Sequence, residues 1–244
     1  PLLEAWLADE TVKRRDTLRY VRILAHGKAG QIAEARQAAL AWIAEDPDAL
    51  PPRQALLRAL VTAERHDEAL NLLDGWALQA EGPATAPSTA PAPEPEPEAE
   101  RPQSVLAWCR ESIVRVLAAQ GKFPEALDRV DRYLRDAPQD IELLNLKATC
   151  LAETERREES IRCLEQVRKL TPDDAGANNN LGYTLADMGV RLDEAERMIA
   201  LAVAIKPDQM AYLDSLAWVY YKTGRVGRAA AIFAQILTVA EDED

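Results

Sequence analysis

The chain has 244 residues, of which 48% are apolar but only 5% are aromatic, and it carries a formal net charge of −12. The negative charge is concentrated in residues 81–102 and in the last four residues, so the rest of the chain is nearly balanced. No basic stripe is left to neutralise phosphates, which argues against a nucleic-acid-binding surface. The sequence also lacks a run of about 18 apolar residues, which argues against a membrane-spanning helix.

Small residues recur along the chain at an almost constant spacing. The positions are Ala35, Ala69, Ala126, Ser160, Ala195 and Ala229, and each lies in a short helical pattern of the same shape. Neighbouring positions are 34 or 35 residues apart, except for one gap of 57 residues. A fixed period of about 20 to 50 residues is typical of solenoids, in which each unit buries its apolar face against its neighbours. The spacing therefore predicts an all-α repeat protein.

Each unit consists of an apolar helix, a turn that often contains Gly, an amphipathic helix and often a Pro. In the last unit, Leu213, Leu216 and Tyr220 follow helical spacing, Gly224 ends this helix, and Phe233 lies in a second apolar stripe. Small residues allow two antiparallel helices to approach closely, and larger apolar groups fill the space beside them. A Pro after the second helix prevents that helix from continuing.

This period and this order of residues resemble the tetratricopeptide repeat family. The run from Asn178 to Tyr221 also resembles a subtype that is common in bacterial multi-repeat proteins. The resemblance implies a right-handed α-solenoid of about six helix–turn–helix repeats, which begin near Asp16, Leu50, Ala107, Ile141, Ala175 and Met210. Four positions depart from the family pattern: Arg22, His26 and Lys147 replace apolar residues, and Ser160 replaces Ala.

The repeats divide the chain into five predicted segments. Residues 1–15 are interpreted as the second helix of a truncated preceding repeat or as an N-terminal cap, and residues 242–244 as an acidic tail. Repeats 1 and 2 occupy 16–81, and repeats 3 to 6 occupy 103–241. Between them, residues 82–102 are rich in Pro, Ala and Glu, and the alternating prolines prevent a helix. This insertion is a surface loop of one solenoid, a hinge between two blocks, or a Pro-rich ligand for another module.

No pattern of catalytic or metal-binding residues occurs. Cys109, Cys150 and Cys163 form no Cys-x-x-Cys pair, and neither His26 nor His66 has a partner at a recognisable catalytic spacing. We therefore predict no enzymatic activity, no cofactor and no metal site. Packed free thiols favour a reducing, cytoplasmic compartment. The compartment stays open, export included, because the sequence begins without Met and looks truncated.

The resemblance to tetratricopeptide repeats also implies an inner groove lined by the first helix of each repeat. In the last three repeats the candidate partner-binding residues are Asn145, Thr149, Asn179, Asn180, Tyr183, Asp214, Trp218, Tyr221 and Lys222. Asn amides can bond to both the donors and the acceptors of a peptide backbone, and Tyr and Trp are frequent binding hot spots. The alternative for the asparagines is helix capping or surface polarity, and the alternative for Trp218 and Tyr221 is packing between repeats.

One binding mode of the family is missing from this sequence. Some members grip a C-terminal carboxylate with a Lys–Asn–Asn–Lys–Arg clamp, but the corresponding positions here are Asn145, Thr149, Asn180, Ala211 and Ser215, without the cations. We therefore expect an interaction scaffold for an uncharged or mixed-charge protein or peptide. The alternative is a non-catalytic regulatory or targeting segment of a larger enzyme.

The last predicted helix carries apolar residues on its outer side as well. These are Ala230, Ile232, Leu237 and Val239. A terminal repeat needs a polar outer face to remain soluble. Truncation of a longer array, cover by self-association into a homo-oligomer, and harmless exposure are the three interpretations of this face.

Overall fold

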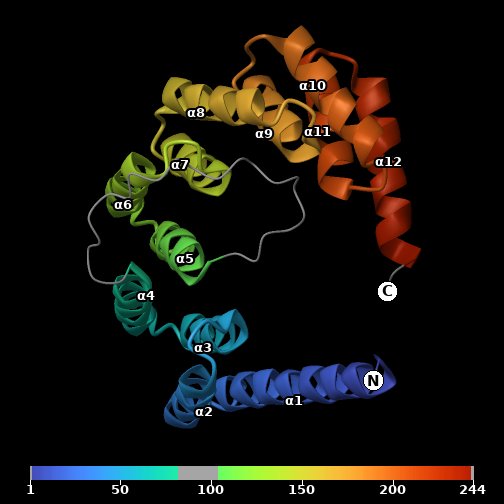
Figure 1. Cartoon of the computed structure of the whole chain (residues 1–244). Coiled ribbons are helices and arrows are strands. Elements are labelled where there is room, and N and C mark those ends of the chain that lie inside the picture. The colour runs from blue at the N-terminus through green and yellow to red at the C-terminus, as the bar shows by residue number, and fades with distance from the viewer. Residues whose placement is uncertain (1, 82–103, 243–244) are drawn as a thin grey trace. The chain divides into compact units, whose positions relative to one another are not determined.

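The computed structural model describes residues 2–81 and 104–242, and the side chains of residues 13–81 and 104–237. The described residues form twelve α-helices and no strand (Figure 1). The helices are α1 Leu2–Lys28, α2 Ile32–Glu45, α3 Leu50–Thr62, α4 His66–Glu81, α5 Val105–Ala119, α6 Phe123–Asp136, α7 Ile141–Glu153, α8 Arg157–Leu170, α9 Ala175–Asp187, α10 Leu192–Ile205, α11 Met210–Lys222 and α12 Val226–Asp242. The pairs α1–α2, α3–α4, α7–α8, α9–α10 and α11–α12 pack as helix–turn–helix hairpins, so the predicted all-α repeat solenoid is confirmed.

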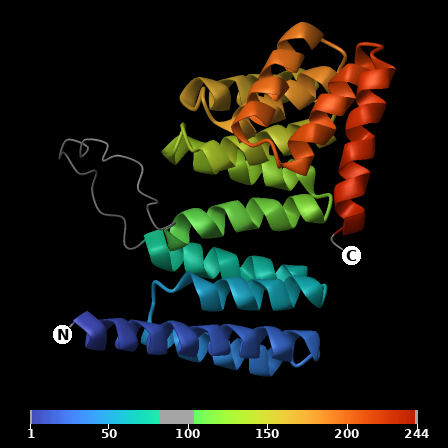
Figure 2. The same ribbon diagram turned by 90° about the vertical axis from the view of Figure 1, so that its right-hand side faces the viewer.

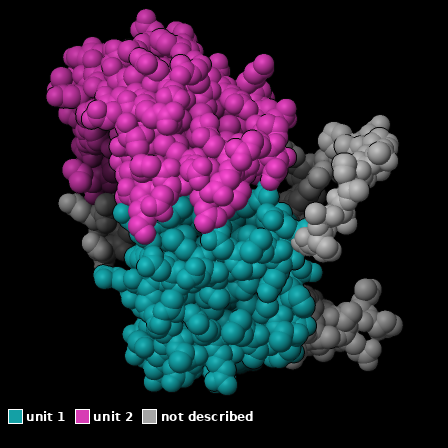
Figure 3. All heavy atoms as spheres, turned by 90° about the vertical axis from the view of Figure 1, so that its left-hand side faces the viewer, with its two compact units in different colours: residues 1–120 teal, residues 121–244 magenta. Residues whose placement is uncertain are grey.

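The helices are grouped into two compact units, residues 1–120 and residues 121–244 (Figure 3). In unit 1, α1 packs against α2 and α3, and α4 packs against α5, as successive layers of helices (Figure 2). In unit 2, α7 packs against α8, α9 against α10, and α11 against both α9 and α12. The buried apolar core of unit 2 includes Leu181, Leu185 and Ile199, which are inaccessible to solvent.

Apart from Arg191, whose φ is 49° just before α10, the turn between the two helices of each repeat contains one residue in the left-handed backbone region. Four of these residues are Gly30, Gly121, Gly189 and Gly224, with φ between 68° and 77°, and the other two are Glu64 and Glu155, with φ of 58° and 60°. A residue in this region ends a helix and reverses the chain, and Gly adopts it without strain. The glycines noted in the sequence therefore fix four of the turns, whereas two turns form without Gly.

Helices α4 and α5 pack against each other although residues 82–102 separate them in the sequence. The ring centroids of Trp76 and Trp108 are 6.3 Å apart, and Arg110 Nη2 lies 3.1 Å from Glu81 Oε1. Both indole side chains are buried. The insertion itself lies outside the described residues. Because of these contacts, α5 belongs to the same compact unit as α1–α4, and the division between units falls after Gln120 and not at the insertion.

The N-terminal helix differs from the predicted boundary near residue 15. Helix α1 runs without a break from Leu2 to Lys28, so residues 1–15 are not separated from the first repeat by a turn. No Gly or Pro occurs between Leu2 and His26 to end the helix. The side chain of Thr17 is accommodated by a 2.8 Å hydrogen bond from its Oγ1 to the Lys13 carbonyl.

Three of the four polar residues that depart from the family pattern have partners within the structure: Ser160, Lys147 and His26. Ser160 is only 1% exposed, and its Oγ donates a 2.8 Å hydrogen bond to the Ala148 carbonyl. Lys147 forms an ion pair with Asp131, with 2.7 Å between Nζ and Oδ1. His26 Nδ1 lies 2.8 Å from Gln31 Oε1. These contacts explain how the hairpins retain their geometry with polar residues at apolar positions.

Replacing Gly75 by Ala is expected to raise the free energy of unfolding by about 1 kcal/mol, because Gly is less favourable than Ala in a helix interior. Gly75 lies inside α4, and a Cβ atom added there meets no atom within 4 Å. Urea denaturation followed by circular dichroism measures the change. A decrease in stability would show that this helix position is more crowded than the structure indicates.

The three cysteines are free thiols, as predicted, and Cys109 and Cys150 are buried. Burial raises the pKa of the Cys109 thiol from its ordinary value of 9.0 to about 12. The unfolded chain therefore loses this proton first, and the contribution of the neutral thiol to stability is lost as the pH rises from about 9 towards 12. We expect the stability difference between the unmodified chain and Cys109→Ala to shrink over this range, measured as urea midpoints at pH 8 and pH 10. A pH-independent difference would contradict this assignment.

Candidate partner-binding groove

The first helices of the last three hairpins carry three stripes of mostly polar side chains. Residues four apart lie on the same face of a helix. The stripes are Asn145, Thr149 and Glu153 on α7, Asn179, Tyr183 and Asp187 on α9, and Asp214, Trp218 and Lys222 on α11. Corresponding residues of neighbouring stripes are 34 or 35 positions apart, so the repeat brings them to the same level of each helix. We call these nine residues the groove stripes.

A hollow of about 250 Å³ lies between α7 and α9. Its polar rim and small or apolar floor are formed by Asn145, Ala148, Thr149, Ala152, Glu153, Ser160, Leu164, Asn180, Tyr183 and Thr184. Ala148, Ser160 and Leu164 are almost completely buried. The hollow thus brings together four of the predicted site residues, and its floor suits an apolar side chain surrounded by hydrogen-bonding groups.

Two asparagines of the groove stripes have amide oxygens that neither water nor protein can reach. Asn145 Oδ1 and Asn179 Oδ1 are both buried and lack a hydrogen-bond partner. Asn179 is only 8% exposed, which is less open than the sequence predicted, whereas Asn180 is exposed. The N-cap of α9 is instead Asp174, whose Oδ1 accepts a 2.7 Å hydrogen bond from the Ala177 N–H, while Asn178 Nδ2 donates 2.8 Å hydrogen bonds to the Pro172 and Asp174 carbonyls of the preceding turn. A buried amide without a partner is costly, and a ligand can satisfy it after rotation of the amide.

Tyr183 occupies the middle of the α9 stripe and is 42% exposed. Partial burial raises the pKa of its hydroxyl, and the carboxylates of Asp187 and Asp214 raise it further. Both carboxylates therefore act on the same hydroxyl, one from α9 and one from α11. Tyr183 thus lies within electrostatic reach of the predicted site residue Asp214 and also of Asp187.

Trp218 contributes to packing between hairpins. It is half-buried against the core that includes Leu185 and Ile199, although its Nε1 has no hydrogen-bond partner. Its ring is stacked on Tyr221 at a centroid distance of 5.5 Å, and Tyr221 is 54% exposed. The packing alternative therefore applies to Trp218 more than to Tyr221.

The cation of Lys222 already has partners within unit 2. Its Nζ donates a 2.7 Å hydrogen bond to the Asp187 carbonyl and lies 5.3 Å from the centroid of the Trp218 ring. Positive charge is favourable at the end of a helix, where unpaired carbonyls accumulate. Lys222 therefore joins α11 to α9.

Glu153 and Asp187 were not among the predicted site residues. Each follows a predicted residue by four positions, Thr149 and Tyr183 respectively, and the same step leads from Trp218 to Lys222. Glu153 lines the hollow, and Asp187 acts on the Tyr183 hydroxyl. Extending each stripe by one helical turn would have identified both carboxylates from the sequence.

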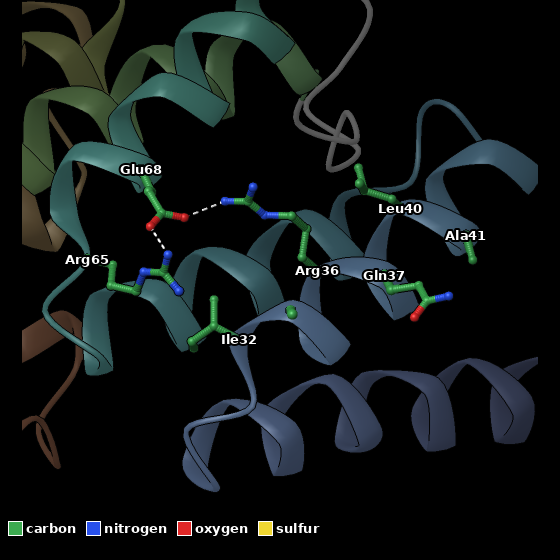
Figure 4. Close-up of a pocket in the computed structure, with 8 residues that line it drawn as sticks. Ile32, Arg36, Gln37, Leu40, Ala41, Arg65 and Glu68 are labelled. Carbon is green, nitrogen blue, oxygen red and sulfur yellow. Dashed lines mark hydrogen bonds and ion pairs between the residues drawn. The ribbon is translucent and has the colours of Figure 1, made fainter.

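A second hollow, of about 630 Å³, lies on α2 and the start of α4 in unit 1 (Figure 4). Its lining includes the 44%-exposed Leu40 and two arginines that flank one carboxylate. Arg36 Nη2 lies 2.5 Å from Glu68 Oε2, and Arg65 forms an ion pair with the other carboxylate oxygen. Both guanidinium groups are thus paired within the hollow, which contains none of the predicted site residues.

The outer side of α12 is partly exposed. Ala230 is exposed, Leu237 is 63% exposed and Ile232 is half-buried, while the side chain of Val239 lies outside those described. A homo-oligomer formed through this face stays a prediction. Sedimentation equilibrium of the unmodified chain and of the Leu237→Glu variant tests this prediction. A dimer that forms through α12 would dissociate in the variant, because the introduced charge would lie in the apolar interface.

Two other kinds of site are missing from the described part of the chain. No three His, Cys, Asp or Glu side chains among residues 13–81 and 104–237 are grouped closely enough to hold a metal ion. None of the described helices is both long and apolar enough to cross a membrane.

Comparisons with known proteins agree with the hairpin pattern. Residues 117–179 and 152–209 match models of the tetratricopeptide repeat. A TPR repeat-containing protein of Pseudomonas aeruginosa is 32% identical over 120 residues, which cover 49% of this chain and 20% of the relative. The chain thus spans about a fifth of the length of this relative.

Solved structures resemble this chain in fold. A tetratricopeptide repeat protein from Parabacteroides merdae has a TM-score of 0.59 at 14% identity, over 91% of this chain and 80% of its own. A thermophilic TPR protein of Thermus thermophilus has a TM-score of 0.57 at 18% identity, over 78% and 91% of the two chains. YrrB, described as a TPR protein with an unusual peptide-binding site, has a TM-score of 0.51 at 18% identity, over 84% and 93%.

The repeated hairpins place the chain in the class of α-solenoid repeat proteins. The matches to repeat models identify residues 117–209 as tetratricopeptide repeats, and the similarity to the Pseudomonas aeruginosa relative supports the same family.

Proposed function

We propose that the chain is a non-catalytic interaction scaffold that holds an extended peptide segment of a protein partner against α7, α9 and α11. The main observation in support of this proposal is the hollow between α7 and α9. Its rim includes Asn145, Thr149, Asn180 and Tyr183. Tetratricopeptide repeats act in general as surfaces for protein partners. The peptide-binding site reported for YrrB, a protein of the same fold, supports this type of ligand.

The chemistry of the groove fits a peptide backbone. An extended peptide presents donors and acceptors in alternation, and an Asn amide offers both. Asn145 and Asn179 each have an amide oxygen without a partner, and Asn180 is exposed beside them. The exposed rings of Tyr183 and Tyr221 provide apolar contact area that a bound segment would cover. Backbone hydrogen bonds would then hold the segment, and the hollow would receive one of its side chains.

The test is capture of partners from a lysate of the source organism, followed by affinity measurement with the purified partner. The bait is the unmodified chain beside a variant with Asn180→Ala, Tyr183→Ala and Tyr221→Ala, all exposed groove positions. We expect the variant to bind at least about tenfold more weakly, because truncating a central aromatic contact typically costs over 1 kcal/mol.

The matched control carries Leu201→Ala and Ile205→Ala. Both residues are apolar side chains of α10 exposed to a similar degree, 43% and 44%, and lie outside the groove stripes. Circular dichroism must show equal helicity for all baits. Equal binding by the groove variant and the unmodified chain would rule out the groove as the binding surface.

A further inference from the structure

We infer that the groove selects a basic peptide segment, with a Lys or Arg side chain bound beside Tyr183 among the carboxylates of Glu153, Asp187 and Asp214. This inference rests on the proposed function and specifies its ligand. It differs from the sequence-based expectation of an uncharged or mixed-charge partner. The reason for the difference is that Glu153 and Asp187 join Asp214, while the single cation of the groove stripes is already engaged.

Each of the three carboxylates is related to Tyr183, one through a shared hollow and two through their charge. Glu153 and Tyr183 line the same hollow. Asp187 and Asp214 both act electrostatically on the Tyr183 hydroxyl and raise its pKa, after the larger effect of burial. No ion pair of Glu153, Asp187 or Asp214 occurs among the described side chains, whereas other carboxylates of unit 2, such as Glu194 with Arg191 and Glu196 with Arg225, are paired. Three carboxylates without an ion-pair partner therefore lie on the groove stripes, two of them acting on the Tyr183 hydroxyl.

The positions of two of these carboxylates are unfavourable for the fold. Glu153 is the last residue of α7, and Asp187 is the last residue of α9. Helix C-termini carry partial negative charge, so an acidic side chain there is destabilising, whereas a cation is stabilising. Lys222, at the same position of α11, follows the favourable pattern and binds the Asp187 carbonyl. A cation from a ligand would relieve both the repulsion among the carboxylates and the unfavourable interaction with the helix ends.

Independent observations in the same groove point to a peptide as the carrier of that cation. Asn179, four residues before Tyr183 on the same stripe, is more than nine-tenths buried and has an amide oxygen without a partner. Rotation of this amide would expose the oxygen, which could then accept a hydrogen bond from the N–H of a ligand backbone. The aromatic face of Tyr183 attracts a Lys or Arg head group, and the floor of Ala148 and Leu164 accepts an apolar neighbour. The Asn179 amide, the Tyr183 ring and the three carboxylates are therefore complementary to a peptide segment that combines basic and apolar residues.

An acidic peptide segment is expected to bind this groove poorly. Its carboxylates would face Glu153, Asp187 and Asp214 with only Lys222 to oppose them, and the Lys222 cation is held by the Asp187 carbonyl and the Trp218 ring. Like charges at an interface suppress binding, and opposite charges speed association in a salt-dependent manner.

The experiment is selection of random dodecapeptides displayed on phage against the full chain. The selected sequences should be enriched in Lys and Arg and depleted in Asp and Glu relative to the input library. The affinity of one selected peptide, measured by calorimetry, should fall about tenfold in the double variant Glu153→Gln, Asp187→Asn, and should lose most of its salt dependence. The thermal midpoint of this variant should not fall, because both changes remove charge that the helix ends disfavour.

The matched control is the double variant Glu158→Gln, Asp208→Asn, which removes the same charge from exposed positions of unit 2 outside the groove stripes. Unchanged affinity in this control supports local recognition. Selection of neutral or acidic peptides that still require Tyr183 would overturn the inference of a basic ligand and leave the peptide groove intact. Equal weakening by both double variants would also overturn it. Peptides that bind the Tyr183→Ala variant as well as the unmodified chain, or no selected peptides at all, would overturn the proposed function too.

Discussion

Replacing Gly182 by Val is expected to lower the free energy of unfolding of unit 2 by about 3 kcal/mol, because the substitution overpacks a close contact between two helices. A Cβ atom at position 182 would lie 2.7 Å from Ile199 Cγ1, 3.0 Å from the Ala195 carbonyl oxygen and 3.3 Å from Met198 Cβ. Relief requires α9 and α10 to separate, which would also open the buried core around Leu181 and Leu185. Urea denaturation followed by circular dichroism at 222 nm measures the loss.

Gly227→Val is the matched control in the same unit. Gly227 lies in α12, and a Cβ atom there meets nothing within 4 Å. The same exchange of Gly for Val should therefore change stability by less than about 1 kcal/mol. Equal effects at positions 182 and 227 would show that the close approach of α9 and α10 does not limit the residue at position 182.

Replacing Arg53 by Ala should lower the free energy of unfolding of unit 1 by about 3 kcal/mol, because it removes the donor of two carbonyl groups, one of them buried, and a large packed side chain. Arg53 is only 4% exposed. Its Nη1 donates to the Ala49 carbonyl at 2.6 Å, and its Nη2 donates to the Pro47 carbonyl at 2.7 Å. The guanidinium carbon lies 5.5 Å from the centroid of the Trp76 ring. Burial lowers the pKa of Arg53, because it disfavours the charged form of the guanidinium group. The hydrogen bonds and the contact with Trp76 offset this effect and stabilise the buried cation.

Arg58→Ala provides the comparison, since Arg58 belongs to the same helix but is exposed. Its truncation should change stability by less than about 0.5 kcal/mol. Arg53→Lys should recover only part of the loss, because an ammonium group cannot reproduce the planar fork that reaches two carbonyls and covers Trp76. Similar midpoints for the Arg53→Ala and Arg58→Ala chains would contradict a structural role for Arg53.

Much of the fold could be predicted because the repeat supplies the same information several times. The predicted repeat starts at Leu50, Ile141, Ala175 and Met210 coincide with the first residues of α3, α7, α9 and α11. The predicted start at Ala107 lies two residues inside α5, which begins at Val105. The larger difference is in the N-terminal helix, where the period suggested a boundary near Asp16 but no residue of the sequence interrupts the helix. A period marks equivalent positions, whereas the end of a helix depends on local residues such as Gly and Pro.

The candidate site was predicted less completely, because the exposure of a side chain depends on how neighbouring hairpins pack. Asn179 and Asn180 are adjacent in the sequence, yet the first is buried and the second is exposed. Trp218 and Tyr221 both looked available, but Trp218 packs on the core formed by α9 and α10. Helical spacing assigns a face, while the degree of burial on that face is set by contacts between units of the repeat.

The contact of α4 with α5 determines what the joining segment must do. Since Trp76 and Trp108 hold the two helices together, the connection between Glu81 and Ser104 only has to return the chain to a fixed point. The entropic penalty of such closure grows with the logarithm of length, and doubling the length adds only about 0.6 kcal/mol. This junction can therefore vary widely in length and composition among related chains, and it offers a place to insert a reporter domain without disturbing the repeats.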